Sequence, residues 1–120
     1  MPTRELEVTV RRREGAAVID LAGDVDASAE AALQRGYDEA VTGDPPVVLN
    51  FADADYINST GIALIVGLLA QARARGIDIT ACGLSDHYRE IFEITRLADF
   101  MRIADNEDGA VKGAERTDDA

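Results

Sequence analysis

"VVLNFADADYINSTGIALIV" (residues 47–66) joins an apolar run, a polar segment and a second apolar run. The run at 47–51 is typical of a strand covered on both faces of a sheet. Three small polar residues at 58–60 then lead into a stretch without charge as far as Ala72. We predict a helix over 59–75 that begins at Asn58 or Ser59 and ends at Gly76. Because it is apolar nearly all round, we expect it to be a central buried helix.

On both sides of this stretch, segments in which apolar and polar residues alternate, as in strands, are followed by segments with apolar residues at helical spacing. The predicted strands lie at 6–11, 16–23, 77–82 and 100–104, and the predicted helices lie at 29–40, at 86–95 and from about 106. The first two strands form a hairpin around Glu14-Gly15. The order β-β-α-β-α-β-α-β-α predicts an α/β fold with a mixed, mostly parallel sheet of four to five strands. We expect one domain over 1–112 and a disordered acidic tail over 113–120.

Composition narrows the functional class. The 120 residues carry 12 Lys and Arg against 23 Asp and Glu, a net charge of −11, which disfavours direct binding of nucleic acid. One cysteine, Cys82, excludes an internal disulfide and favours a reducing compartment. The N-terminus does not resemble a signal peptide, and the longest uncharged apolar run is too short to span a bilayer. We expect a cytoplasmic protein without membrane insertion, either a monomer or a weak dimer.

Acidic residues follow two predicted strands at the edge where parallel strands end. Residues 14–60 carry ten acidic residues and one base, and "GDVD" (23–26) and "DADYINST" (53–60) hold four of the acids. If these strands are neighbours, Asp26 lies close to a loop at 53–59. Ser59 then lies at a helix N-terminus, where free N–H groups suit a phosphate. Phosphorylation there would add about −1.5 to −2 charges without refolding the domain. The alternative is that Asn58 or Ser59 only caps the helix.

Other chemistries have less support. Clustered aspartates at strand ends also occur with Mg²⁺ in receiver domains, but the only lysine, Lys112, lies in the last predicted helix. His87 falls at a helix start and Cys82 in a strand, with no partner pattern for either residue. Arg11–Arg13 are interpreted as a solvated strand end, with a partner contact as the alternative. We therefore expect no catalytic residue, no metal and no cofactor, and hence no enzyme.

Three motifs in the correct order resemble the STAS domain, and most closely the bacterial anti-sigma factor antagonists. They are "GDVD", the quoted stretch at 47–66 and "GLSDHYREIFEITRLADFMRI" at 83–103, within a likeness that covers about residues 5–110. In that family a serine kinase of GHKL type, the anti-sigma factor, phosphorylates the antagonist. The unphosphorylated antagonist binds this kinase and releases the sigma factor, and a serine phosphatase resets the system.

The resemblance implies roles for individual residues. Ser59 matches the phosphorylated serine, Thr60 and Gly61 match the residues that follow it, and Asp26 matches the acid after the second strand. Asn58 departs from the family's usual aspartate at that position. The expected partner-binding residues are Asp24, Asp26, Asp55, Ile57, Asn58, Ser59, Thr60, Gly61 and Ile62. The alternative function is a STAS scaffold or regulatory subunit that does not switch, in a signalling or transport complex.

Overall fold

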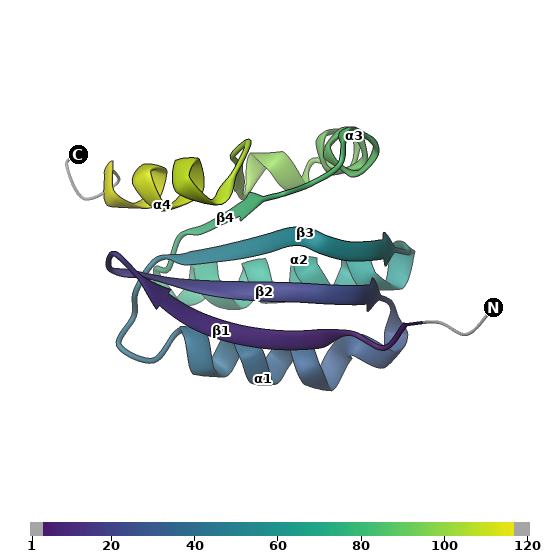
Figure 1. The fold of residues 1–120 in the computed structure, drawn as a ribbon, viewed down its shortest axis with the longest axis horizontal. Coiled ribbons are helices and arrows are strands. Elements are labelled where there is room, and N and C mark those ends of the chain that lie inside the picture. Colours follow the sequence, from purple (N-terminus) through teal and green to yellow (C-terminus); the bar gives the residue numbers. More distant parts are fainter. Residues whose placement is uncertain (1–3, 117–120) are drawn as a thin grey trace.

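A computed structural model describes residues 4–116 as one five-stranded sheet flanked by helices (Figure 1). The elements are β1 (Glu7–Arg13), β2 (Ala16–Val25), η1 (Ala27–Ala29), α1 (Glu30–Ala40), β3 (Val47–Ile57), α2 (Ser59–Arg75), β4 (Ile79–Cys82), α3 (Asp86–Ile94), η2 (Leu97–Asp99), β5 (Arg102–Ile103) and α4 (Glu107–Arg116). The strands lie side by side in chain order; β1 is antiparallel to β2, and the other pairs are parallel. The predicted α/β fold and the order of its elements are confirmed.

The sheet is covered on both faces, as the apolar run at 47–51 predicted. Val47, Leu49 and Phe51 of β3 belong to the large core beneath α1 and α2, and the Phe51 ring meets Phe92 edge to face at 5.6 Å. Val48 points to the opposite face and joins a small second core under α4. Alternate residues of one strand thus fill two cores, which is why β3 reads as nearly continuous hydrophobic sequence.

The prediction that α2 is a central buried helix is wrong. One side of α2 is buried through Ile65, Leu68, Leu69 and Ala72, whereas Val66 is 46% exposed. In the uncharged stretch 61–72, three of the five exposed residues are Ala or Gly, which count as apolar but expose little surface. The helix therefore looks apolar all round in sequence while it forms an outer layer of the molecule.

The predicted loop at 53–59 is also wrong, because β3 continues to Ile57 and only Asn58 separates it from α2. Likewise β2 includes Asp24 and Val25. Beyond Asn50, β3 has lost β4 as a neighbour and pairs with β2 alone, through two register shifts. This ribbon is held by backbone hydrogen bonds, which tolerate the exposed aspartates that made the segment look like a loop.

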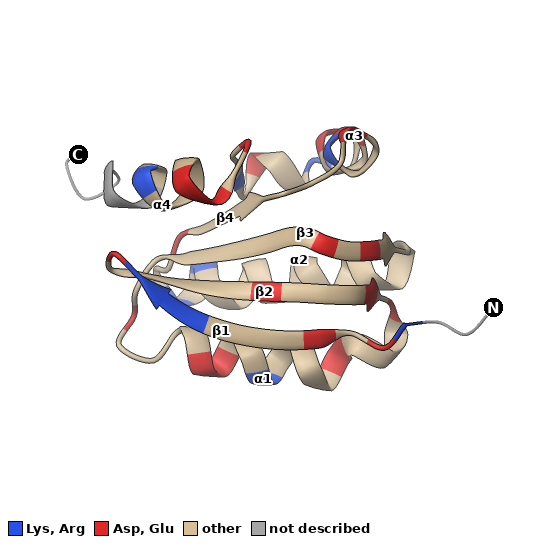
Figure 2. Ribbon diagram, viewed as in Figure 1, with Lys and Arg blue, Asp and Glu red and all other residues tan. Residues whose placement is uncertain are grey.

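Arg11 and Arg12 are exposed at the end of β1, as predicted, but the three arginines also contact neighbouring elements. Arg11 and Arg13 form ion pairs with Glu107 and Asp108 at the start of α4. Arg12 donates hydrogen bonds to the carbonyls of Ala40 and Glu39 at the end of α1, at 2.9 and 2.8 Å. Figure 2 shows this basic cluster near the β1–β2 turn, at the opposite end of β2 from Asp24.

The C-terminal helix extends into the predicted tail. α4 covers Ala16, Val18, Val48 and Cys82 through its own buried Ala110 and Val111. It continues to Arg116, although the tail was predicted from residue 113; residues 117–120 lie outside the described residues. Among the described residues, no helix has the length and hydropathy that crossing a bilayer requires.

Candidate functional site

The candidate site lies where β2 and β3 end and α2 begins, at the arrowheads of these strands in Figure 1. β2 and β3 are neighbours, as the sequence argument required, with Val25 in register with Ile57. The N–H of Asn58 donates to the carbonyl of Val25 at 3.2 Å, which extends the pairing by one residue. The sheet thereby fixes the position of the first turn of α2.

Asn58, and not Ser59, caps α2. Its backbone is extended, and its side-chain oxygen accepts a hydrogen bond of 2.8 Å from the N–H of Gly61. Ser59 is then the first helical residue, and both Ser59 and Thr60 are exposed. The described side-chain hydrogen bonds include none to the Ser59 hydroxyl. The cap is made by its neighbour, so this hydroxyl stays on the surface at the N–H-rich end of a helix.

Gly61 allows α2 to lie directly on β2. A Cβ atom at this position would lie 2.0 Å from the carbonyl oxygen of Val25 and 2.7 Å from its carbonyl carbon. Both atoms are backbone, so a side chain here would have to push the helix away from the sheet. The glycine of the motif therefore sets how closely Ser59 approaches the end of β2.

Three of the acidic residues near this end have partners among the described residues. The Asp24 carboxylate is buried and accepts a 3.1 Å hydrogen bond from the N–H of Arg4. Asp26 is half-buried and accepts from the N–H and hydroxyl of Ser28, at 2.9 and 2.6 Å. It caps η1 and not α1, which begins after η1 without a side-chain cap. Asp55 is exposed and pairs with the Arg4 guanidinium at 2.9 Å.

The structure brings the nine predicted contact residues to one end of the molecule but at three depths. Asp55, Ser59 and Thr60 are exposed; Asp26, Asn58 and Ile62 are half-buried; Asp24, Ile57 and Gly61 are buried. The buried three support the surface from beneath. The exposed and half-buried residues form what we call the Ser59 face: Asp26, Asp55, Asn58, Ser59, Thr60 and Ile62.

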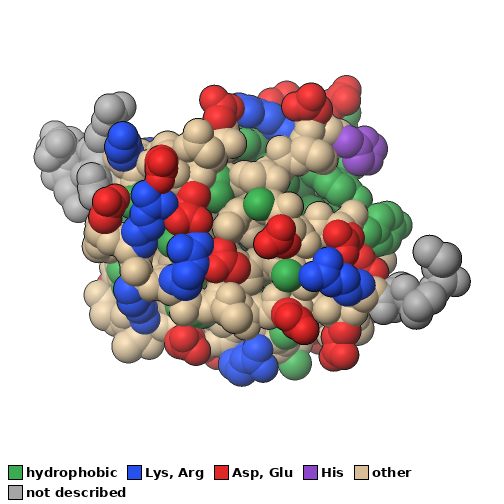
Figure 3. Space-filling view, in the orientation of Figure 1, with side chains coloured by type: hydrophobic (Ala, Val, Ile, Leu, Met, Phe, Trp, Pro, Cys, Tyr) green, Lys and Arg blue, Asp and Glu red, His purple; other side chains and the backbone are tan. Residues whose placement is uncertain are grey.

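Sequence reasoning missed three residues at this end. Tyr56 is 53% exposed beside the Ser59 face, and its aromatic side chain in the quoted stretch was a signal that could have identified it. The Tyr88 hydroxyl of α3 accepts a 3.0 Å hydrogen bond from the N–H of Ile57. Arg4 makes the ion pair with Asp55, and no local pattern pointed to it. In Figure 3, hydrophobic side chains gather near the end of the molecule where β3 and α3 lie, beside acidic ones.

Three other features considered from the sequence are the acidic residues, Cys82 and His87. Within residues 4–116, no three His, Cys, Asp or Glu side chains are placed to hold a metal ion. Burial raises the pKa of the Cys82 thiol to about 11, so this thiol stays protonated at neutral pH. His87 is exposed in the first turn of α3.

Comparison with known proteins agrees with this architecture. A sequence model of the STAS domain matches residues 7–110. The anti-sigma-B factor antagonist of Listeria monocytogenes is 29% identical over 96 residues, which cover 79% of this chain and 83% of the relative.

Two solved structures share the fold at low identity. A sulfate transporter family protein from Wolinella succinogenes is 17% identical with a TM-score of 0.78, over 92% of this chain and 93% of the other. The Bacillus cell fate determinant SpoIIAA in its phosphorylated form is 19% identical with a TM-score of 0.65, over 92% and 99%. The family model covers all five strands and most of the helical layers, and on that basis the chain belongs to the STAS domain family, in which its curated relatives are anti-sigma factor antagonists.

Proposed function

We propose that this chain is an anti-sigma factor antagonist switched at Ser59. Its unmodified form binds an anti-sigma factor that is a GHKL-type serine kinase, and this binding releases the sigma factor. Phosphorylation of Ser59 ends the binding, and a serine phosphatase restores it. The observation that carries the proposal is the exposed Ser59 hydroxyl at the first position of α2, left free because Asn58 makes the cap.

Electrostatics explains how a phosphate at this position acts on docking and not on folding. The N-terminus of a helix stabilises nearby negative charge through its dipole and its free N–H groups. The surrounding surface carries Asp26, Asp53 and Asp55, with Arg4 as the nearest described base at Asp55. A phosphate therefore costs the fold little. It would, however, add about −1.5 to −2 charges and the bulk of a phosphate group to a docking surface that is already acidic.

The contact surface that we propose is the Ser59 face together with Tyr56. Half-exposed aromatic side chains are frequent anchors of protein interfaces, and Tyr56 lies beside Asn58 and Ser59 at the end of β3. Ile57 and Gly61 hold this surface in place from below, through the Tyr88 hydroxyl and the carbonyl of Val25. For the switch to act through charge, the docked partner must carry acidic groups opposite Ser59, which an added phosphate repels.

The modification itself is tested by incubating the protein with its cognate kinase and ATP and mapping the product by mass spectrometry. We expect one phosphate, on Ser59. The Ser59→Ala variant should take up none, while Thr60→Ala, altered at the neighbouring exposed hydroxyl, should be phosphorylated like the parent. Phosphate on Thr60 or elsewhere, or none at all, contradicts the proposal.

A second candidate is a STAS domain that does not switch, acting as a scaffold or regulatory subunit. The observation in its favour is the likeness to the sulfate transporter family protein, which has a higher TM-score than the phosphorylated SpoIIAA structure. A pull-down with the unmodified protein separates the two. Recovery of a GHKL-type kinase supports the switch, whereas recovery of a transporter and no kinase supports the alternative.

A further inference from the structure

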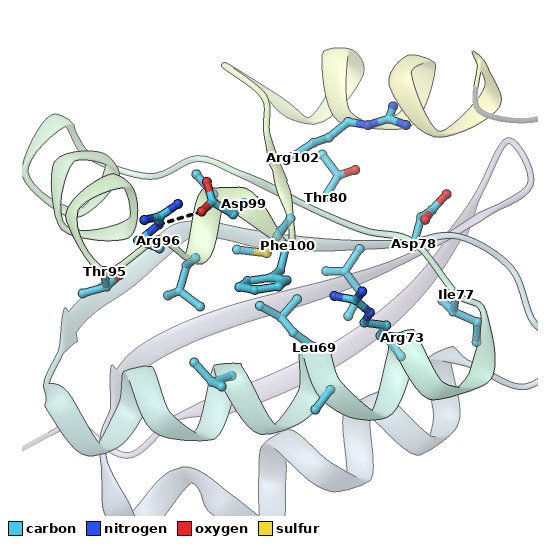
Figure 4. A pocket seen from close by; sticks show the side chains of 17 residues that line it. Leu69, Arg73, Ile77, Asp78, Thr80, Thr95, Arg96, Asp99, Phe100 and Arg102 are labelled. Atoms are coloured by element: carbon cyan, nitrogen blue, oxygen red, sulfur yellow. Dashed lines mark hydrogen bonds and ion pairs between the residues drawn. The ribbon is translucent and has the colours of Figure 1, made fainter. Parts of the chain in front are cut away.

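A groove of about 720 Å³ opens beside the middle of α2, away from the Ser59 face (Figure 4). It lies between the middle of α2, the start of β4 and the segment from Thr95 to Arg102. Leu69 lies ten residues after Ser59, which at 1.5 Å per residue places the groove about 15 Å along the helix. Its volume falls within the usual range for sites of small molecules, roughly 300 to 1,000 Å³.

The floor of the groove is apolar, and apolar surface at its mouth is exposed to solvent. Leu69, Ile77, Leu97 and Met101 line it and are buried. Phe100, whose ring is drawn above Leu69 in Figure 4, is 60% exposed. An exposed aromatic ring next to a concave apolar floor indicates a binding site, because a ligand that covers this apolar surface lowers the free energy.

Three arginines and two acids, Asp78 and Asp99, border this opening. The Arg73 guanidinium lies 5.8 Å from the centroid of the Phe100 ring, and no carboxylate of the described residues forms an ion pair with it. Arg96 also lines the groove but is paired with Asp99 at 2.8 Å. Arg102 donates to the carbonyl of Gly113 and is thus engaged with α4. Arg73 is therefore the cation left available at the mouth.

We propose that this groove binds an amphipathic monoanion of the fatty-acid class. The aliphatic chain fills the space over the apolar floor and beneath Phe100, and the carboxylate pairs with Arg73. A planar guanidinium can hold a carboxylate through two parallel hydrogen bonds, which suits this head group. An uncharged chain would leave Arg73 without a counter-charge, and a cationic one would be repelled by it.

The test is a titration of ¹⁵N-labelled protein with sodium decanoate, below its micelle concentration, followed by amide chemical shifts. We expect saturable shifts at Leu69, Arg73 and Phe100, with no saturable shifts at Ser59 and Thr60. Decanol, with the same chain and no charge, should bind at least about tenfold more weakly. Shifts that do not saturate, that map elsewhere, or that decanol reproduces at equal affinity would overturn the proposal.

Two variants assign the binding to the groove. Arg73→Gln should weaken decanoate binding about tenfold, whereas Arg75→Gln should not change it, because Arg75 pairs with Asp44 and does not line the groove. Ala70→Phe fills the groove from an exposed position and should abolish binding without lowering the unfolding midpoint. Equal affinity of the parent, Arg73→Gln and Ala70→Phe contradicts the assignment.

Discussion

At the scale of single residues, two neighbours at the start of α2 perform separate tasks. Asn58 supplies the oxygen that caps the helix, so the Ser59 hydroxyl is not needed for stability. Gly61 lets the same helical turn touch the carbonyl of Val25. The first turn is therefore held rigidly through backbone and cap contacts, while Ser59 and the neighbouring Thr60 are exposed to solvent. Such an arrangement lets a modification alter the surface and leave the fold intact.

The two glycines of α2 should respond in opposite directions to the same substitution. In Gly61→Ala the added Cβ meets the backbone of Val25 at 2.0 Å, and we expect the free energy of unfolding to fall by about 3 kcal/mol. In Gly67→Ala the Cβ meets nothing within 4 Å, so alanine should raise it by about 0.5 to 1 kcal/mol. Urea denaturation followed by circular dichroism measures both. A Gly61→Ala variant as stable as the parent would contradict the close approach of helix and strand.

Two substitutions of Asn58 distinguish the effect of the helix cap from the effect of a negative charge at this position. Asn58→Ala removes the acceptor for the Gly61 N–H and should cost about 1 kcal/mol of stability. Asn58→Asp keeps an acceptor and restores the family's usual aspartate, so stability should stay within about 0.5 kcal/mol of the parent. We expect its rate of Ser59 phosphorylation to change by at least about fivefold, near 1 kcal/mol in barrier height. Kinase assays beside urea denaturation test this, and a large loss of stability with an unchanged rate would contradict it.

What the sequence could predict about the site was local. The motif placed Ser59 at a helix start because hydroxyls, glycine and apolar periodicity lie within a few residues of one another. It could not show that Arg4 pairs with Asp55, 51 residues away, or that Tyr88 bonds the N–H of Ile57. Those contacts depend on where the strands lie in the sheet and on how α3 packs against the end of β3.

At the scale of elements, α4 is held to the sheet by a small apolar core and by ion pairs at its first turn. Its small core contains alanines, valines and Cys82, and its first turn meets Arg11 and Arg13. Arg11 also pairs with Asp20, whose second partner is the amide of Asn50. Hydrogen bonds from Arg11 lower the pKa of both Asp20 and Glu107, with Asn50 assisting at Asp20 and Arg13 at Glu107.

Because the pKa values of Asp20 and Glu107 are lowered in the folded protein, we predict that acid destabilises the fold. A carboxylate whose folded pKa is lowered stabilises the fold above its unfolded pKa, near 4, and loses that contribution as pH falls through the folded value. We expect the free energy of unfolding to fall steadily below about pH 4.5. Glu107→Gln should be less stable than the parent at pH 7 and show a shallower loss in acid. Asp53→Asn, an exposed acid without a described ion pair, is the control and should keep the parent slope; equal slopes for all three proteins would contradict this account of α4.

The boundaries of helices and strands were predictable where the side-chain pattern determines them. They were not predictable where backbone hydrogen bonds determine them. The order of strands and helices followed from the period of the hydrophobic residues, and every predicted strand and helix is present in the structure. The extension of β3 through Asp53 and Asp55 was missed because pairing with β2 uses main-chain groups that no side-chain pattern reports. The exposed side of α2 was missed because alanine and glycine look apolar while covering little area.

At the scale of the whole molecule, α2 joins two surfaces of different chemistry. Its first turn forms part of the acidic Ser59 face, and its middle forms a wall of the apolar groove bordered by Arg73. The basic cluster of β1 is engaged with α4 at the opposite end of β2 (Figure 2). The acidic end is the docking surface that we propose, and a sheet with two cores would give a charge-operated switch the rigid support it requires.

The most direct test is calorimetric binding of Ser59→Ala and Ser59→Asp to the purified anti-sigma kinase, with urea denaturation of both variants. We predict that Ser59→Ala binds like the unmodified parent. Ser59→Asp should bind at least about 100-fold more weakly, because its carboxylate is repelled by acidic groups of the docked partner, while the stability of both stays within about 0.5 kcal/mol of the parent. Equal affinities for the two variants, or a loss of affinity matched by unfolding of Ser59→Asp, would contradict a switch that acts through charge at the tip of α2.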